Sequence, residues 1–542
     1  MDILKIIPLL SIACAIVMSA CNSGNKDNTG GGNNTGNAIT VNPKEMKRIG
    51  SVDERYQSYN VEMVEVVGGE FWRPYNTMDS LPASASTSTY DISQKNEQLY
   101  RKLPPINLAD KRLRNLAKGL APAYVRVSGT WANATYFQDN DRPPIAKAPE
   151  GFVNVLTRSQ WKGVIDFIKA TDGKLVTSFA VSNGVRDDRG VWTPKEAQKI
   201  VNYTKSLGGE IAGAELFNEP NIPTAGGAID TSYGASNFAK DVAVFNAWAS
   251  KVVPDMLVLG PGNAMEGLPD VNLEQIGMKA GMKVLTTQEM MTAEPKPVFD
   301  VFTYHFYGAI SMRMVRSGPA SIKPENALDS AWLHRTDIVA DYHIGLRDKY
   351  LPGKPIWITE TAQAAAGGDP YAVTYLDCFR YLYQLGTLAQ KGLQVIMHNT
   401  LVASEYSLID QDTHLPKPNY WAALLWQRLM GTEVYDAGTG APGVYLFAHN
   451  WKGHQGGITL LVINTNKTAA PITIPSNAEQ FTLTAKELQD TTVQLNGQAL
   501  QLAANDELPS FKGQAIEAGE VQLPSTSITF ITFADVGNQS QK

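Results

Sequence analysis

Two glutamates, Glu219 and Glu360, have the residue type and setting for acid and nucleophilic chemistry. Each closes a short apolar run that is typical of a β-strand, in the sequences Glu215-Leu-Phe-Asn-Glu-Pro-Asn221 and Ile356-Trp-Ile-Thr-Glu-Thr361. A glycosidic bond is cleaved with retention when one carboxylic acid protonates the leaving oxygen and a second carboxylate, about 5 Å away, attacks the anomeric carbon. The pair therefore indicates glycoside hydrolysis, whereas either glutamate alone would more simply be a solvated loop acid.

The elements around these acids alternate between strand and helix. Because eight such units suit one closed sheet, we expect a (β/α)₈ TIM barrel over residues 46–431, with a doubly wound open sheet as the alternative. In a barrel the active site lies at the carboxyl ends of the strands, which would bring both glutamates to one pocket. The expected strands are 61–67, 124–127, 175–181, 212–217, 256–260, 299–306, 355–359 and 393–397, separated by helical periods such as 159–170, 194–207, 235–253, 273–284 and 371–391.

The pattern changes at about Thr432, where short strands separated by turns replace the helical periods. Gly456-Gly457, Asn464-Thr465-Asn466 and Asn496-Gly497 break the chain between the strands. Residues 432–542 are therefore expected to form a C-terminal antiparallel β-sandwich.

The N-terminal residues resemble an export signal. Lys5, an apolar run over 6–17 and Met18-Ser19-Ala20-Cys21 resemble a bacterial lipobox, which implies a signal peptide over 1–20 and a lipid anchor on Cys21. The alternative is an ordinary cleaved signal. Residues 21–45, rich in Asn, Gly and Thr, suit a flexible linker. We expect an exported, lipid-anchored protein at a bacterial outer membrane, cell surface or periplasm.

The composition excludes several classes of protein. A net charge of -6 disfavours a nucleic-acid partner. After signal removal only Cys21 and Cys378 would remain, so no disulfide framework is expected. The seven histidines lack metal-ligand spacing and no nucleotide-binding fingerprint occurs, so no metal and no cofactor are expected.

Several motifs, in order and spacing, resemble glycoside hydrolase family 79, the heparanase and β-glucuronidase family of clan A. Besides the two glutamate runs, they are Pro122 to Thr130, Tyr304-His305-Phe306-Tyr307, Gly367-Gly368, Tyr406, Asp410, Asn419-Tyr420-Trp421 and Val493 to Gly497. The resemblance spans most of the chain from Gly119 onward. It implies a TIM barrel with an appended sandwich and a carbohydrate substrate.

The resemblance implies a role for each matched residue near the pair. Glu219 would be the proton donor and Glu360 the nucleophile. Asn218 would hydrogen-bond the sugar 2-hydroxyl, with a strand-end cap as the simpler alternative. Arg126 would keep Glu360 ionised, unless it forms a purely structural ion pair. Tyr307 would lie near the nucleophile.

The resemblance also implies a uronate substrate, because three further residues would bind the sugar carboxylate. Tyr406 would lie near the sugar carboxylate, and Gly367 and Gly368 would offer backbone N–H groups to it. Ala364-Ala365-Ala366 departs from the heparanase pattern here.

The sequence therefore favours a β-glucuronidase acting by double displacement. Sulfated heparan is disfavoured, because no run of Lys and Arg is present to bind it. The alternatives are a clan A hydrolase for a neutral xyloside or glucoside, and a surface glycan-binding lipoprotein without activity, against which the retained acid pair argues.

Overall fold

The computed structural model describes residues 39–78, 98–225, 229–279, 282–534 and 536–538, which all belong to one compact unit. Cys21, the predicted signal over 1–20 and most of the predicted linker over 21–45 lie outside these residues. Within the described ranges, no helix has the length and apolar character needed to cross a membrane.

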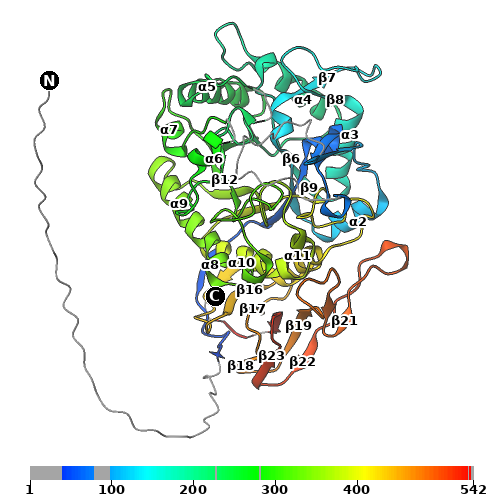
Figure 1. Ribbon diagram of the computed structural model, residues 1–542. Helices are drawn as coiled ribbons and strands as arrows, with labels where there is room; N and C mark the ends of the chain where they lie inside the picture. Colours follow the sequence, from blue (N-terminus) through cyan, green and yellow to red (C-terminus); the bar gives the residue numbers. More distant parts are fainter. Residues whose placement is uncertain (1–38, 79–97, 226–228, 280–281, 535, 539–542) are drawn as a thin grey trace, which may run out of the picture. The chain divides into compact units, whose positions relative to one another are not determined.

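A closed barrel of eight parallel strands forms one part of the unit (Figure 1). The last strand pairs with the first, which closes the sheet. The strands are β3 (Gln57–Glu62), β6 (Ala123–Ser128), β9 (Gly173–Ser178), β10 (Gly213–Glu215), β11 (Leu257–Ala264), β12 (Val301–Tyr307), β13 (Ile356–Ala362) and β14 (Val395–His398). The helices around them include α2 (Lys111–Gly119), α3 (Arg158–Ala170), α4 (Lys195–Ser206), α5 (Ala235–Val252), α6 (Leu273–Lys279), α7 (Thr287–Thr292), α8 (Ser330–Leu333), α9 (Arg335–Tyr350), α10 (Leu376–Gln390) and α11 (Pro418–Leu429).

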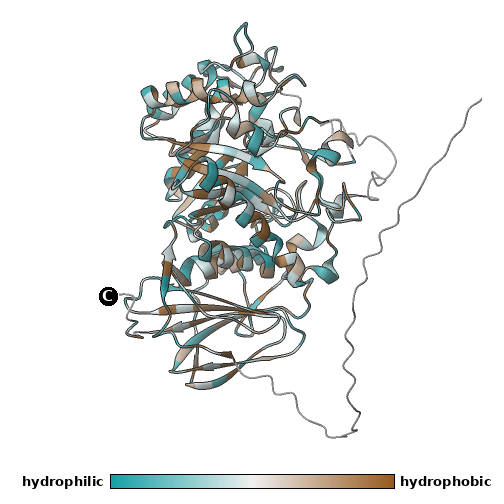
Figure 2. Ribbon diagram, turned by 90° about the vertical axis from the view of Figure 1, so that its left-hand side faces the viewer, coloured by the Kyte–Doolittle hydropathy of each residue, from teal (hydrophilic) through white to brown (hydrophobic). Residues whose placement is uncertain are grey.

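The barrel strands are buried on both faces, because side chains fill the interior and helices cover the outside. Every residue of β3, β6, β12 and β13 is buried. Figure 2 shows helices with alternating teal and brown segments, as expected where one face packs and the other meets water. The predicted fold class, a TIM barrel with a C-terminal antiparallel sandwich, is confirmed.

The first barrel strand lies earlier than the sequence predicts. The run 61–67 was expected to be a strand, but β3 ends at Glu62 and Met63–Val67 forms the short helix α1. The side chain of Glu65 accepts a hydrogen bond from the Glu62 N–H, which begins the helix there. A short apolar run does not distinguish a strand from a buried helix by its period.

The sandwich follows from β15 (Met430–Tyr435) onward. One sheet has the order β2-β15-β16-β17-β24-β19-β20-β21, with β22 beside β19, and the other has the order β1-β18-β23. Helix α10 of the barrel is buried along nearly its whole length, and it contacts β16. A Cβ on Gly386 would lie 2.3 Å from the Phe447 ring, so this glycine lets the strand approach the helix closely. The further strands are β16 (Val444–Trp451), β17 (Ile458–Asn464), β18 (Ala470–Ile474), β19 (Ala478–Thr484), β20 (Gln494–Leu495), β21 (Gln498–Ala499), β22 (Gln514–Ile516), β23 (Gly519–Leu523) and β24 (Ser527–Phe533).

The start of the described chain belongs to the sandwich, which corrects the predicted boundaries at 45 and 46. β1 (Ile39–Thr40) pairs with β18, and β2 (Arg48–Ser51) pairs with β15. Val41 and Met46 are buried in the same small core. These two apolar side chains interrupt the polar segment, and their burial orders residues that the composition assigned to a linker.

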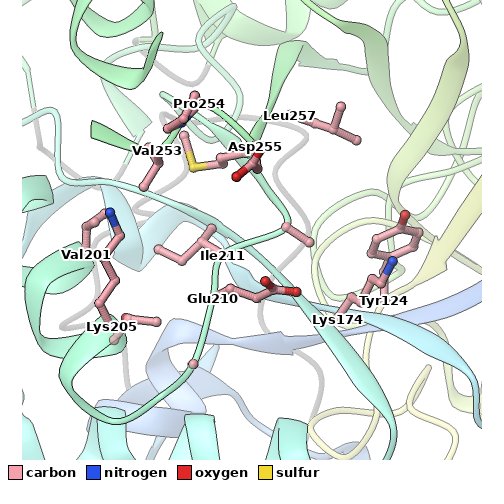
Figure 3. A pocket seen from close by; sticks show the side chains of 14 residues that line it. Tyr124, Lys174, Val201, Lys205, Glu210, Ile211, Val253, Pro254, Asp255 and Leu257 are labelled. Atoms are coloured by element: carbon pink, nitrogen blue, oxygen red, sulfur yellow. The ribbon is translucent and has the colours of Figure 1, made fainter. Parts of the chain in front are cut away.

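A cavity of about 400 Å³ lies at the amino-terminal end of the barrel (Figure 3). Tyr124, Lys174, Glu210 and Asp255 line it together with apolar side chains. This end of a TIM barrel contributes to stability, whereas the chemistry belongs to the opposite end. The cavity therefore does not enlarge the candidate active site.

We expect a form that begins at residue 52 to be less stable than a form that begins at residue 38. The shorter form lacks β1, β2, Val41 and Met46, which at roughly 1.5–3 kcal/mol for each fully buried apolar side chain lowers the free energy of unfolding by about 3–6 kcal/mol. Urea unfolding followed by tryptophan fluorescence measures the difference, with the full chain as the control. Equal midpoints for the two forms would show that the N-terminal strands do not stabilise the sandwich.

Candidate active site

Glu219 lies just beyond β10, in a turn that two asparagines hold in place. The Asn218 N–H donates to Asn133 Oδ1, and Asn133 Nδ2 donates back to the Asn218 carbonyl, both at 3.0 Å. The side chain of Asn221 makes a similar pair of bonds with the backbone of Ala264 in β11. Glu219 has a φ of 55°, which is uncommon for a residue other than glycine. The surrounding bonds thus fix the acid in an unfavourable backbone conformation, a feature that often accompanies function.

Glu360 lies in β13, beside His305 of β12. The register between these strands shifts just before this pair, and such irregularities re-aim side chains next to active sites. One carboxylate oxygen of Glu360 lies within 4.8 Å of one carboxylate oxygen of Glu219. The structure therefore brings the two predicted acids together at the carboxyl ends of the fourth and seventh barrel strands.

Arg126 connects the groups beneath the acid pair. Its Nη1 donates to Glu360 Oε2 at 2.9 Å, while Nε and Nη2 donate to Glu215 Oε2 at 3.0 and 2.8 Å. Nη2 also donates to Asn218 Oδ1 at 2.7 Å. The guanidinium is only 1% exposed, so both carboxylates offset a charge that water does not reach.

Glu215 is the permanent partner of this buried arginine. The hydroxyl groups of Thr303 and Thr359 donate to Glu215 Oε1 at 2.9 and 2.6 Å. Burial opposes ionisation, but the charge of Arg126 and the hydrogen bonds outweigh it and hold the Glu215 pKa well below its usual range. The lowered pKa therefore favours a negatively charged Glu215 at neutral pH.

His305 links the two candidate acids. Its Nδ1 lies 3.0 Å from Glu219 Oε1 and 3.8 Å from Glu360 Oε2. Burial favours the neutral ring, but the charge of Glu360 and the interactions with Glu215 and Glu219 outweigh it and raise the His305 pKa to about 9. The raised pKa favours the protonated ring of His305 at neutral pH.

Glu219 has the electrostatic character of an acid. Burial raises its pKa, the hydrogen bond to His305 lowers it, and the charge of Glu360 raises it again, so that the net pKa lies above the usual value. Glu360 is held differently, because Arg126 donates to one of its oxygens and the Tyr307 hydroxyl donates to the other at 2.6 Å. Two carboxylates with different surroundings can therefore take different roles.

A group of polar side chains beside Glu360 continues the network. Asn399 Nδ2 donates to the hydroxyls of Tyr307 and Tyr406, at 3.1 and 3.2 Å, and to Glu62 Oε1 at 3.1 Å. Tyr406 is thus connected to the nucleophile side of the site through Asn399.

Glu62 is a further buried acid beside the site, and the sequence does not reveal it. Within the described residues its Oε2 has no hydrogen-bond partner. Burial and the nearby charge of Glu360 raise its pKa well above the usual value. A neutral Glu62 adds no second negative charge beside Glu360.

Gly367 and Gly368 form a buried loop against Tyr406. Both have positive φ angles, 87° and 81°, and a Cβ on Gly367 would lie 2.8 Å from Trp72. The Gly368 N–H donates to the Ala364 carbonyl at 3.2 Å, so it is not free in this structure to bind a uronate as the sequence predicted. Local turn formation within the loop accounts for that bond.

Glu219, His305 and Glu360 are close enough to suit a cation by distance alone. However, a metal requires a neutral imidazole, whereas the raised pKa of His305 favours the protonated ring and the guanidinium of Arg126 lies beside it. The donor set therefore suits proton transfer better than metal binding.

Sequence reasoning found the acid pair, Arg126 and Tyr307 but not His305, Glu62 or Asn399 as parts of the site. His305 precedes Tyr307 by two residues in a strand, so both point to the same side, and this spacing was the available signal. Glu62 was hidden because its strand was misplaced. Asn399 follows β14 directly, at the end where barrel sites form.

Comparison with known proteins agrees with this geometry. Mouse heparanase is 26% identical over 486 residues, which cover 78% of this chain and 85% of heparanase. Baicalin-β-D-glucuronidase from Scutellaria baicalensis is 24% identical over 445 residues, which cover 75% and 79% of the two chains. No protein-family model matches the sequence.

A solved structure shares the fold. The 4-O-α-L-rhamnosyl-β-D-glucuronidase from Fusarium oxysporum superposes with a TM-score of 0.58 at 14% identity, over 91% of this chain and 100% of its own. A TIM barrel that carries paired carboxylates on its fourth and seventh strands is the architecture of a glycoside hydrolase. The relatives narrow this class, because the chain is a glycoside hydrolase that is similar in sequence to heparanase and to a β-glucuronidase. The resemblance to glycoside hydrolase family 79 is thereby confirmed.

We expect Arg126→Gln to destabilise the fold by about 3–5 kcal/mol at pH 7, because it leaves Glu215 as an uncompensated buried charge. Since the Glu215 pKa is depressed in the folded state, its ionic contribution is present above its unfolded pKa of about 4.3 and is lost as the pH falls. The difference between wild type and variant should therefore shrink in acid. Urea unfolding at pH 7 and pH 4 tests this.

Arg158→Gln is the matched control, because Arg158 pairs with Asp139 at a partly exposed position. This change should cost much less than Arg126→Gln, because an exposed ion pair contributes little to stability. An Arg126 variant as stable as that control would mean that the central ion pair contributes nothing to folding.

Proposed function

We propose that this protein is a retaining β-glucuronidase that acts on glucuronate-containing polysaccharides or glycoconjugates by double displacement. The separation of Glu219 and Glu360 carries the proposal. Their nearest ligand atoms lie within 4.8 Å. Carboxyl groups in retaining enzymes are roughly 5–5.5 Å apart, whereas inverting enzymes leave roughly 6.5–9.5 Å for a water molecule.

In the first step, Glu219 protonates the glycosidic oxygen while Glu360 attacks the anomeric carbon. The bond between the anomeric carbon and the leaving oxygen breaks, and an ester between the sugar and Glu360 forms. Arg126 and Tyr307 hold the two Glu360 oxygens, which orients the attacking carboxylate. Asn218 lies beside the acid, and its side chain is held by Arg126 in a place from which it can reach the sugar 2-hydroxyl.

In the second step, Glu219 acts as a base and takes a proton from the water that breaks the ester. Ester formation removes the negative charge of Glu360, and this charge is one cause of the raised Glu219 pKa. Loss of that charge lowers the Glu219 pKa when a base is needed. The same carboxyl group therefore serves as acid and then as base.

A glucuronate substrate is supported by the names of the relatives, among them a plant β-D-glucuronidase. Tyr406 and Gly367 would lie beside the sugar carboxylate. The excess of acidic residues over basic ones favours an unsulfated chain over a heavily sulfated one.

A neutral β-glycoside is the second candidate, and one observation favours it. The Gly368 N–H already donates to the Ala364 carbonyl. The predicted carboxylate pocket therefore has one N–H donor fewer for a uronate.

A panel of nitrophenyl β-glycosides separates the two candidates. We expect a form that begins at residue 38 to hydrolyse the glucuronide in preference to the glucoside, xyloside and galactoside. Glu219→Gln should slow turnover by about 10²–10⁴-fold, because general acid–base catalysis contributes that much. Glu360→Gln should abolish turnover, since it removes the group that bonds to the sugar.

Glu210→Gln provides the control, because Glu210 is an exposed acid at the other end of the barrel. Preference for a neutral glycoside would retain the mechanism and reject the uronate specificity. Proton NMR of the first product settles the stereochemistry, and an initial α-anomer would rule out retention.

His305→Gln should shift the pH dependence of kcat/KM. The imidazolium and its hydrogen bond lower the Glu219 pKa, so their removal raises that pKa further. Because Glu219 must carry a proton in the first step, the alkaline limb of the profile should move to higher pH. His454→Gln, on the sandwich surface, should leave the profile in place, and a limb that moves to lower pH would contradict the assignment.

A further inference from the structure

The segment Gly69–Met78, which we call the strap, crosses one side of the active site. It comprises β4 (Gly69–Trp72) and the short helix η1 (Tyr75–Thr77). The Tyr75 hydroxyl donates to the Gly368 carbonyl at 3.2 Å. Trp72 packs on Gly367 so closely that a Cβ there would lie 2.8 Å from it, and its ring stacks on Tyr100 with ring centroids 4.7 Å apart.

A buried ion pair anchors the strap. Arg313 Nη2 donates to Glu405 Oε2 at 2.7 Å, and Arg313 Nη1 donates to the Arg73 carbonyl at 2.7 Å. The other oxygen of Glu405 accepts the Tyr75 N–H at 2.8 Å. The Arg313 guanidinium also lies 4.3 Å from the centre of the Tyr75 ring. Because Arg313 is fully buried, separating these groups would leave a charge without its partner, so the strap is firmly held.

The strap lies on the side of the barrel away from the acid. It follows β3, and its partners Arg313, Gly368 and Glu405 follow β12, β13 and β14. Glu219 follows β10, which is four strands from β14 in the closed sheet of eight and therefore faces it across the barrel. The leaving group must lie towards Glu219, because that residue protonates its oxygen.

The sugar ring itself therefore extends towards the strap. In a pyranose ring C4 lies opposite C1, so a further sugar attached at O4 would point away from the scissile bond. Here that direction leads to Trp72 and Tyr75, which cover the loop of Gly367 and Gly368. The two glycines are buried beneath them.

We propose that the strap closes the glycone side of the site, so that the enzyme removes single sugars from the non-reducing ends of chains. Trp72 and Tyr75 are the residues that set this limit. The inference rests on the proposed function, since it assigns the glycone side from the roles of Glu219 and Glu360.

The test compares two aryl β-D-glucuronides, one unsubstituted and one with a rhamnosyl group at O4. Wild-type protein should hydrolyse the unsubstituted compound at least 100-fold faster, as judged by kcat/KM. Comparable rates would overturn the exo assignment and leave the proposed function intact. If a neutral aryl glycoside replaces the glucuronide as substrate, the glucuronate assignment fails, and the same comparison with its O4-glycosylated form decides the role of the strap. Absence of turnover on every unsubstituted glycoside would overturn both.

Variants locate the barrier within the strap. Trp72→Ala, alone and with Tyr75→Ala, should reduce the preference for the unsubstituted compound at least tenfold by improving hydrolysis of the substituted one. Trp451→Ala removes an aromatic residue from the sandwich, and its preference should equal that of wild type. A preference in the strap variants that matches wild type, in protein with an unchanged circular dichroism spectrum, would show that these side chains do not set the limit. If the strap variants fail to fold, the wild-type comparison still decides the proposal.

Discussion

Arg126 is buried at the centre of the barrel, where its charge is tolerated because two carboxylates lie against it. An unpaired ion of this size costs several kcal/mol in a protein interior, so the arginine and its partners are fixed together. Glu215 supplies a negative charge, because Arg126 lowers its pKa and two threonine hydroxyls donate to it. The second partner, Glu360, can therefore lose its charge in a covalent step while Arg126 remains paired. Glu215 keeps the arginine paired, and Glu360 is therefore available for the reaction.

The same constraint balances the charges of the whole site. Arg126 pairs with Glu215 and Glu360, and raised pKa values favour the protonated forms of His305, Glu219 and Glu62. In a medium of low dielectric constant, a change in one of these charges shifts the pKa values of the other groups. The acid and the nucleophile are thus coupled through charge as well as through His305, although they come from different strands.

The sequence predicted the parts of this arrangement that depend on local pattern. Eight apolar runs with helices between them indicated the barrel, and Glu219 and Glu360 stood at the ends of two of those runs. The first strand was misplaced because the run from Val61 to Val67 is apolar enough to form either a strand or a buried helix. It also hid Glu62. Long-range contacts left no signal of this kind: the pairing of β2 with β15, the packing of Trp72 on Gly367 and the bond from Gly368 to Ala364 depend on the folded backbone.

The pairing of the N-terminal strands with the sandwich has a consequence for the order of assembly. Arg48 pairs with Tyr435 and Ile39 with Ile472, so the two ends of the described chain meet in one small domain. A ribosome adds about 5–20 residues each second, and the first strands must therefore wait on the order of tens of seconds for their partners. The barrel can close during that time, but the sandwich cannot. Strand β24 thus joins the same small domain as β1 and β2, and the two domains cannot be separated by a single cut in the chain.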